Sequence, residues 1–230
     1  MDQHTETTHG MDVYDAVATR RAVRGFTADP LPKQVLQRVL TAAARSPSTG
    51  NLQPWNIYVV TGAPLADLKC RAMARAAARD PGDSREFEMY PANPGPLYHD
   101  RQIAAVRQRF TALGIAHEDT EARAESNAGN WRCYGAPAAL FCFIRHDMGF
   151  PQWADLGMYL QTVMLLLRAE GLHSCPQMAW TIYRKTVADI VRPAEHLMLY
   201  CGMSIGFEDP SVKYARIDRA PLSETVTFLD

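Results

Sequence analysis

The stretch of residues 153–171 constrains the fold more than any other, because it has the length of a helix and is apolar on almost every side. A helix on the surface of a protein normally carries a polar face, so this one must be deeply buried. Asp155, Gln161 and Arg168 interrupt the apolar run and leave it too short to cross a bilayer comfortably. The sequence therefore predicts a buried helix, and burial between two subunits explains its apolar character better than a membrane does.

Composition indicates one globular domain. The chain has 230 residues, of which 47% are hydrophobic and 21% charged, enough for one sizeable core. We expect this domain to span residues 12–230, after a polar tail at residues 1–11 that has no apolar run of the kind a signal peptide needs. The net charge of −1 argues against nucleic-acid binding, which requires a basic face.

The cysteines favour a reducing compartment. There are five of them, with no C-x-x-C spacing, and most lie in apolar segments. We expect buried thiols and a cytoplasmic protein.

Periodicity predicts alternating helices and strands. Asp12 is placed to cap a first helix that ends before Gly25, and Pro32 suits the first turn of a second helix. Further helices are predicted at residues 65–79, 101–113 and 181–191, and strands at 56–61, 138–145 and 197–207. Residues 80–130 begin with a proline-rich stretch that is typical of a lid.

Two motifs stand near the start of the chain. Residues 46–55, Ser-Pro-Ser-Thr-Gly-Asn-Leu-Gln-Pro-Trp, place several hydrogen-bonding side chains in a loop restricted by two prolines. Alone, this loop is equally well explained as an ordinary connection between a helix and a strand. Residues 20–26, Arg-Arg-Ala-Val-Arg-Gly-Phe, form a basic run about two dozen residues earlier.

Together, the two motifs resemble the nitroreductase family, whose members hold FMN non-covalently. The resemblance implies an α+β fold with a mixed central β-sheet flanked by helices, in an intertwined homodimer. Alternating strands and helices would otherwise suggest a parallel sheet.

The resemblance also implies which residues bind the cofactor. Arg20 and Arg21 match the family positions that hold the FMN phosphate, joined by Arg219 and, more weakly, by Arg216. Arg24 matches the residue near the flavin N1 and C2 carbonyl. The residues that match contacts to the flavin held mainly by the other subunit are Pro47, Ser48, Thr49 and Asn51.

A further family turn faces the flavin ring through its backbone and matches Pro176, Gln177, Met178 and Ala179. Met178 and Ala179 replace the Glu-Gly of some members, and Ala22 stands where the family usually has a hydroxyl residue. Tyr90 and Trp131 are candidates for the substrate-binding wall.

The activity implied is reduction of nitroaromatic or quinone-like compounds by NAD(P)H, with two-electron hydride transfer through flavin N5 in a ping-pong order. NADPH is favoured over NADH, since Arg101, Arg107 and Arg109 are available to meet a 2′-phosphate. A reductive dehalogenase or enone reductase of the same fold, or a flavin-binding protein with little turnover, are the alternatives.

Other motifs carry less weight. Residues 202–206, Gly-Met-Ser-Ile-Gly, match the nucleophile elbow of serine hydrolases, but Pro210 interrupts the helix that should follow and no histidine lies beyond His196. We expect these glycines to be close-packing positions in a strand. No Rossmann or P-loop motif occurs, and His173 with Cys175 has no further ligand cluster, so no metal is expected.

Overall fold

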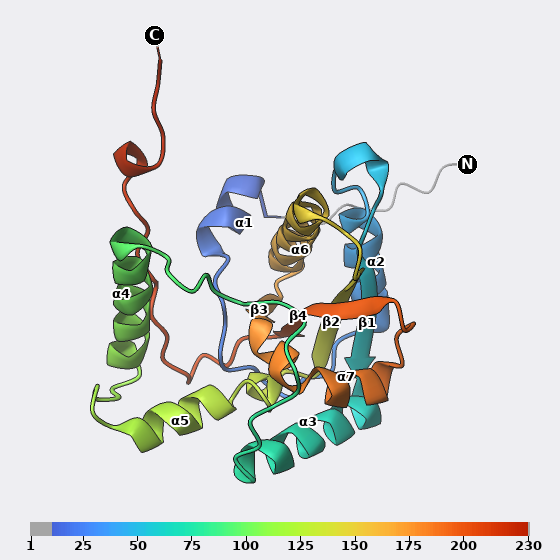
Figure 1. Cartoon of the computed structure of the whole chain (residues 1–230), viewed down its shortest axis with the longest axis horizontal. Coiled ribbons are helices and arrows are strands. Elements are labelled where there is room, and N and C mark those ends of the chain that lie inside the picture. Colours follow the sequence, from blue (N-terminus) through green and yellow to red (C-terminus); the bar gives the residue numbers. More distant parts are fainter. Residues whose placement is uncertain (1–10, 230) are drawn as a thin grey trace. The chain divides into compact units, whose positions relative to one another are not determined.

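The computed structural model describes residues 11–229, which divide into two compact units. The first unit comprises residues 11–87 and 128–210, and the second comprises residues 88–127 and 211–229. Figure 1 colours the chain by residue number, so the segments that make up each unit can be traced in it. None of the helices in residues 11–229 is both long enough and apolar enough to cross a membrane.

The first unit is built on a four-stranded sheet in the order β1-β2-β4-β3. Its strands are β1 (Asn56–Thr61), β2 (Ala138–Arg145), β3 (His173–Gln177) and β4 (Leu197–Gly206). Neighbouring strands pair antiparallel, and the parallel contribution is an isolated bridge between Ala22 and Ser174 at the β3 edge. The α+β fold predicted from the sequence is confirmed, and its mixed character comes from this bridge.

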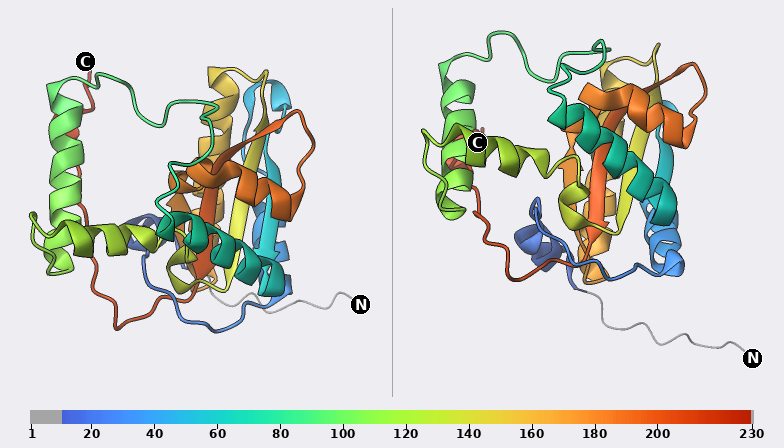
Figure 2. Two further views of the ribbon diagram at one scale, coloured as in Figure 1. Left: turned by 60° about the horizontal axis from the view of Figure 1, so that its bottom comes forward. Right: turned by 90° about the horizontal axis from the view of Figure 1, so that it is seen from below.

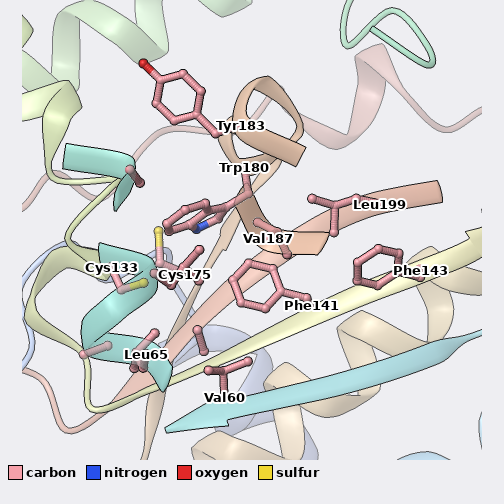
Figure 3. Packing of buried hydrophobic residues seen from close by; sticks show 14 of the residues in the cluster. Val60, Leu65, Cys133, Phe141, Phe143, Cys175, Trp180, Tyr183, Val187 and Leu199 are labelled. Carbon is pink, nitrogen blue, oxygen red and sulfur yellow. The ribbon is translucent and has the colours of Figure 1, made fainter. Parts of the chain in front are cut away.

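Helices cover both faces of the sheet (Figure 2). On one face lie α2 (Lys33–Ala43) and α6 (Phe150–Ala169), and on the other lie α3 (Gly62–Ala77) and α7 (Arg184–Val191). Side chains of β2 alternate between the two cores: Leu140 packs towards α2 and α6, whereas Phe141 packs with Trp180 on the α3 side (Figure 3). Burial on both faces explains why β2 is apolar as far as Ile144, and only its last residue, Arg145, is charged and exposed.

Two glycines of β4 permit close packing, as predicted. A Cβ atom at Gly202 would lie 2.4 Å from Cδ1 of Trp180, and one at Gly206 would lie 2.9 Å from Cδ of Pro137. Ser204, between them, is fully buried within the strand. This geometry excludes an exposed nucleophile at Ser204 and explains the glycines by packing alone.

The cysteines are thiols, and Cys70 is exposed while the other four are buried. Burial raises the pKa of Cys133 to about 11 and that of Cys201 to about 12. These two thiols therefore stay protonated at neutral pH, as expected for packing residues.

Helix α6 buries only one stripe of its surface within the chain. Leu156, Val163 and Leu167 are completely buried, whereas Met158 is 40% exposed. Helix α1 (Val13–Thr19) also exposes apolar side chains, with Tyr14 84% exposed and Val17 53% exposed. The deep burial predicted for α6 is therefore only partly achieved by one chain.

Several element boundaries differ from the sequence-based predictions. Asp12 does cap α1, since its Oδ1 accepts the Asp15 N–H at 3.0 Å, but the helix ends at extended Arg20, well before Gly25. The helix predicted at residues 181–191 is a 3-10 helix (Met178–Tyr183) followed by α7. Strand β3 was not predicted, because it is short and contains Pro176, which a sheet tolerates at its edge.

The second unit contains α4 (Pro96–Ala112), most of α5 (Thr120–Ala128), which was not predicted, and the C-terminal tail with a short 3-10 helix (Leu222–Glu224). The tail is held to α4 by side chains. Gln108 Nε2 donates to Asp218 Oδ2 at 2.7 Å, and its Oε1 accepts the Asp218 N–H at 3.0 Å. Arg101 and Glu224 form an ion pair at 2.8 Å.

Candidate functional site

The basic segment at residues 20–26 lies along the edge of the sheet in extended form. The Val23 N–H donates to the Ser174 carbonyl at 3.1 Å, and Gly25 accepts the Asp209 N–H at 3.0 Å. Val23 is buried, whereas Arg20 is half-buried and Arg24 is exposed. The segment therefore presents cationic side chains beside β3, the strand that leads into residues 176–179.

Arg21 is part of an ion cluster within the first unit. It pairs with Glu208, just beyond β4, and the same carboxylate lies 3.3 Å from His173 Nε2. Burial, reinforced by the nearby Arg168 charge, lowers the pKa of His173 to about 4. His173 is thus neutral at neutral pH, and Glu208 offsets the charge of Arg21.

The turn at residues 176–179 can offer a ligand its backbone but not the side chain of Gln177. That side chain is buried, and its Nε2 donates to the Asn130 carbonyl at 3.0 Å. Its Oε1 accepts hydrogen bonds from Ser204 Oγ and from Trp180 Nε1. Pro176 is exposed, and Met178 and Ala179 are half-buried.

The polar loop is held in an unusual conformation. Gly50, Asn51 and Gln53 have φ values of 61°, 55° and 49°, in the left-handed region that non-glycine residues rarely adopt. Ser48 Oγ accepts the Gln53 N–H at 3.0 Å, while Pro47 and Asn51 are exposed. Consecutive left-handed residues persist only where the surroundings fix them, and such sites are often functional.

Asp155 on α6 supplies that fixation. Both of its carboxylate oxygens accept the Thr49 N–H at 3.1 Å, and Oδ1 also accepts from Thr49 Oγ1 at 3.2 Å. The Asp155 side chain is only 1% exposed. Sequence reasoning treated Asp155 only as an interruption of the apolar helix, although a carboxylate in such a run was itself a signal of a buried polar contact.

The two groups of predicted residues lie at opposite ends of α6. Asp155 holds the polar loop at one end of the helix. Arg168 lies near the basic segment at the other end, where its Nε donates to Thr19 Oγ1 at 3.3 Å. Thirteen residues at a rise of 1.5 Å separate Asp155 from Arg168 by about 20 Å. One chain therefore does not bring the polar loop and the basic segment together along this helix.

The remaining predicted residues occupy other surroundings. Trp131 is half-buried, with its ring centroid 5.5 Å from that of Trp180 and 4.5 Å from that of Tyr183. Tyr90, in the second unit, is 66% exposed. Arg216 and Arg219 are exposed residues of the C-terminal tail.

Arg219 also interacts with the backbone just before it, donating from Nη1 to the carbonyls of Ile217 and Asp218 at 2.8 and 3.0 Å. Across residues 11–229, no group of three His, Cys, Asp or Glu side chains is arranged to hold a metal ion.

Comparison with known proteins identifies the family. The nitroreductase family model matches residues 17–207, which include the basic segment, the polar loop and the turn at residues 176–179. This chain belongs to the nitroreductase family. The resemblance inferred from the two motifs is therefore confirmed.

Individual proteins that are similar to this nitroreductase-family chain support the same family assignment. It is 34% identical to nitroreductase NfnB of Mycolicibacterium smegmatis over 214 residues, covering 91% of this chain and 89% of the relative. It is 32% identical to 4-nitrobenzoate reductase of Pseudomonas putida over 199 residues, covering 86% of each. Among solved structures, the FMN and NADPH-dependent nitroreductase NfnB from Sphigopyxis sp. strain HMH superimposes with a TM-score of 0.91 at 36% identity, covering 96% of this chain and 100% of that chain.

Proposed function

We propose that this protein is an FMN-dependent oxidoreductase that reduces nitroaromatic compounds with NADPH. The observation that carries the proposal is the polar loop, which Asp155 fixes in a left-handed conformation within a chain of this family. Relatives described as nitroreductases that align along most of the chain support the same activity.

The residues present fit FMN. A phosphate needs cationic groups, and in the first unit Arg20 offers one beside the sheet edge. The family resemblance assigns Arg219 of the tail as a second. Arg21 takes part with its charge offset by Glu208, and Arg216 is the weaker member of this set. When bound, FMN would supply two-electron hydride-transfer chemistry through its N5, and we propose that NADPH and the acceptor use it in a ping-pong order.

The protein's own residues bind and orient the reactants. Arg24 would supply a positive charge at the pyrimidine edge of a bound flavin, where negative charge develops, and the backbone of residues 176–179 would face the ring. Tyr90 of the second unit and Trp131 of the first unit are each candidates for contacts with the substrate. No side chain is assigned as a general acid or base, so water supplies the protons.

We further infer that each site combines two chains in a homodimer. The polar loop and the basic segment lie about 20 Å apart along α6 in one chain. A two-fold axis that packs α6 against its symmetry mate in opposite directions would place the loop of one chain, with Pro47, Ser48, Thr49 and Asn51, beside the basic segment of the other. The exposed apolar side chains of α1 and α6, Tyr14 and Met158 among them, offer a surface for this contact.

Subunit complementation tests the two-chain site. Arg20→Ala and Asn51→Ala are each expected to weaken FMN binding. Heterodimers of the two variants, isolated with two affinity tags, should regain one site of wild-type affinity, because one of the two sites receives both intact residues.

A mirrored control uses the same two substitutions. Heterodimers of the wild type with an Arg20→Ala/Asn51→Ala chain should contain no intact site. If the sites lie within single chains, the two results exchange: the first heterodimer has no intact site and the control has one.

Steady-state kinetics test the activity. NADPH oxidation should depend on an added nitroaromatic such as 4-nitrobenzoate, and double-reciprocal plots at several fixed acceptor concentrations should be parallel. Intersecting lines would contradict the ping-pong order. A protein that oxidises NADPH only in amounts equal to its bound flavin would instead be a flavin-binding protein with little turnover, and preference for a haloaromatic or an enone would indicate one of the related reductases.

A further inference from the structure

Arg75, in the last turn of α3, is the centre of a polar network within the first unit. Its Nε donates to Asp80 Oδ2 at 2.7 Å, and its Nη2 donates to Asp83 Oδ1 at 3.0 Å. Its Nη1 donates to Thr186 Oγ1 at 2.9 Å and to Asp83 Oδ2 at 3.3 Å. The side chain is 23% exposed and all three guanidinium nitrogens have partners, so the guanidinium plane is fixed in one orientation.

This guanidinium plane lies against the ring of Tyr183. The central carbon of the Arg75 guanidinium is 4.4 Å from the Tyr183 ring centroid, within the range of a cation–π contact. Tyr183 Oη donates to the Asp80 carbonyl at 3.3 Å. The Tyr183 ring is therefore held at two points, over the ring by Arg75 and at the hydroxyl by the segment that follows α3.

Trp131 packs against the same tyrosine. The ring centroids of Trp131 and Tyr183 are 4.5 Å apart. Trp180, which projects from the same 3-10 helix as Tyr183 (Figure 3), meets the Trp131 ring at 5.5 Å with the two ring planes at 79°. Aromatic pairs at these separations favour defined relative orientations. A single ring, that of Tyr183, therefore links the Arg75 guanidinium to Trp131.

Trp131 also lies next to the turn at residues 176–179. The buried side chain of Gln177 donates from Nε2 to the Asn130 carbonyl at 3.0 Å and to Asn130 Oδ1 at 3.2 Å. The backbone just before Trp131 is thereby tied to the turn that we propose faces a bound flavin. Because Trp131 is only half-buried, part of its surface remains accessible to a ligand.

We propose that Arg75 is a positioning residue that holds Trp131, through Tyr183, in the orientation that contacts a flat aromatic acceptor. The inference rests on the proposed function, in which a nitroaromatic compound is the acceptor and Trp131 is a candidate for contact with it. A stacking contact of this kind stabilises the bound acceptor and the transition state alike, so its loss raises KM and leaves kcat nearly unchanged.

Circular dichroism of the tryptophan side chains in the near ultraviolet tests the positioning in the ligand-free protein. Subtracting the spectrum of the Trp131→Phe version of each protein isolates the Trp131 signal. Arg75→Met, which keeps an apolar stem and loses the charge, should weaken this signal. Arg71→Met is the matched control on α3 and should leave the signal intact, since Arg71 is 51% exposed and pairs with Asp67 at 2.8 Å. An unchanged signal in Arg75→Met would overturn the proposal.

Arg75→Lys decides the question if Arg75→Met does not fold. It keeps the positive charge but loses the planar fork that lies against Tyr183, so the Trp131 signal should still weaken. A wild-type Trp131 signal in Arg75→Lys would show that the fork does not position the ring.

Steady-state kinetics of the FMN-loaded enzyme at saturating NADPH test the consequence for the acceptor. Arg75→Met should raise the KM for 4-nitrobenzoate about fivefold and leave kcat within about twofold of the wild type. In a Trp131→Leu background the same substitution should change KM by less than about twofold, because the ring on which it acts is absent. An unchanged KM, or an equal rise in both backgrounds, would contradict a role through Trp131.

Failure of the proposed function gives a different result. A wild type that takes up no FMN or does not oxidise NADPH would overturn that function and the assignment of an acceptor with it. The dichroism of the ligand-free protein would still show whether Arg75 positions Trp131.

Discussion

Replacing Asp155 with alanine should release the polar loop. The carboxylate is buried and accepts both the N–H and the hydroxyl of Thr49. Hydrogen bonds to a charged group contribute about 1.5–3 kcal/mol each, and removing the buried charge itself offsets part of that loss. We expect Asp155→Ala to lower the free energy of unfolding by about 2 kcal/mol.

Asp155→Ala should also weaken FMN binding. The loss of affinity should be larger than that caused by a distant substitution that lowers the free energy of unfolding by the same amount. Without Asp155, Asn51 loses the support that keeps the loop in its left-handed conformation. We expect the dissociation constant for FMN, followed by quenching of flavin fluorescence, to rise about tenfold, equivalent to about 1.4 kcal/mol.

Two further variants test whether the effect of Asp155→Ala arises from the contacts between Asp155 and Thr49. Thr49→Val removes only the hydroxyl contact and keeps the N–H contact, so it should show about half of the effect of Asp155→Ala on urea unfolding at a fixed protein concentration. In the Thr49→Val background, Asp155→Ala should cost less than in the wild type. Unchanged unfolding midpoints and FMN affinity in Asp155→Ala would refute the idea that this carboxylate holds the loop.

Three further substitutions test other parts of the structure. The free energy of unfolding should fall by up to about 3 kcal/mol as the pH is lowered from 6.5 to 4, since unfolded His173 takes up a proton that the native side chain, with its pKa of about 4, does not, and His173→Gln should flatten this slope in urea titrations. Gly202→Ala should destabilise the protein by about 2 kcal/mol through overlap with Trp180, measured as a lower urea midpoint at an unchanged m-value. Ser204→Ala should cost about 1 kcal/mol of stability through its bond to Gln177 while nitroaromatic-dependent NADPH oxidation continues; loss of an esterase activity in this variant would contradict the packing role.

The sequence predicted strands β1, β2 and β4 well and the short edge strand β3 not at all. Strands β1 and β2 have the predicted bounds, because their runs of apolar and β-branched residues are continuous. Strand β3 has only five residues, one of them Pro176, and depends on pairing with β4, as in the register of Cys175 with Ser204. Local propensity contains no information about such a partner.

The same limit applies to the candidate site. The two motifs revealed the loop and the arginines, because each motif is local in the sequence. Arg21 pairs with Glu208, which lies 187 positions away in the sequence, and Thr49 bonds to Asp155, which lies 106 positions away. Only the fold brings these residues together. Motifs therefore indicated which segments form the site, while long-range contacts decide which side chains remain for a ligand.

The most direct test of the central claim is an absorbance spectrum of the purified protein with FMN, followed under anaerobic conditions. An FMN-dependent nitroreductase should be a yellow protein with two flavin bands, which NADPH bleaches and a nitroaromatic then restores. A protein that stays colourless and takes up no added FMN would contradict this claim, and the arginines and the polar loop would then be ordinary surface and turn residues.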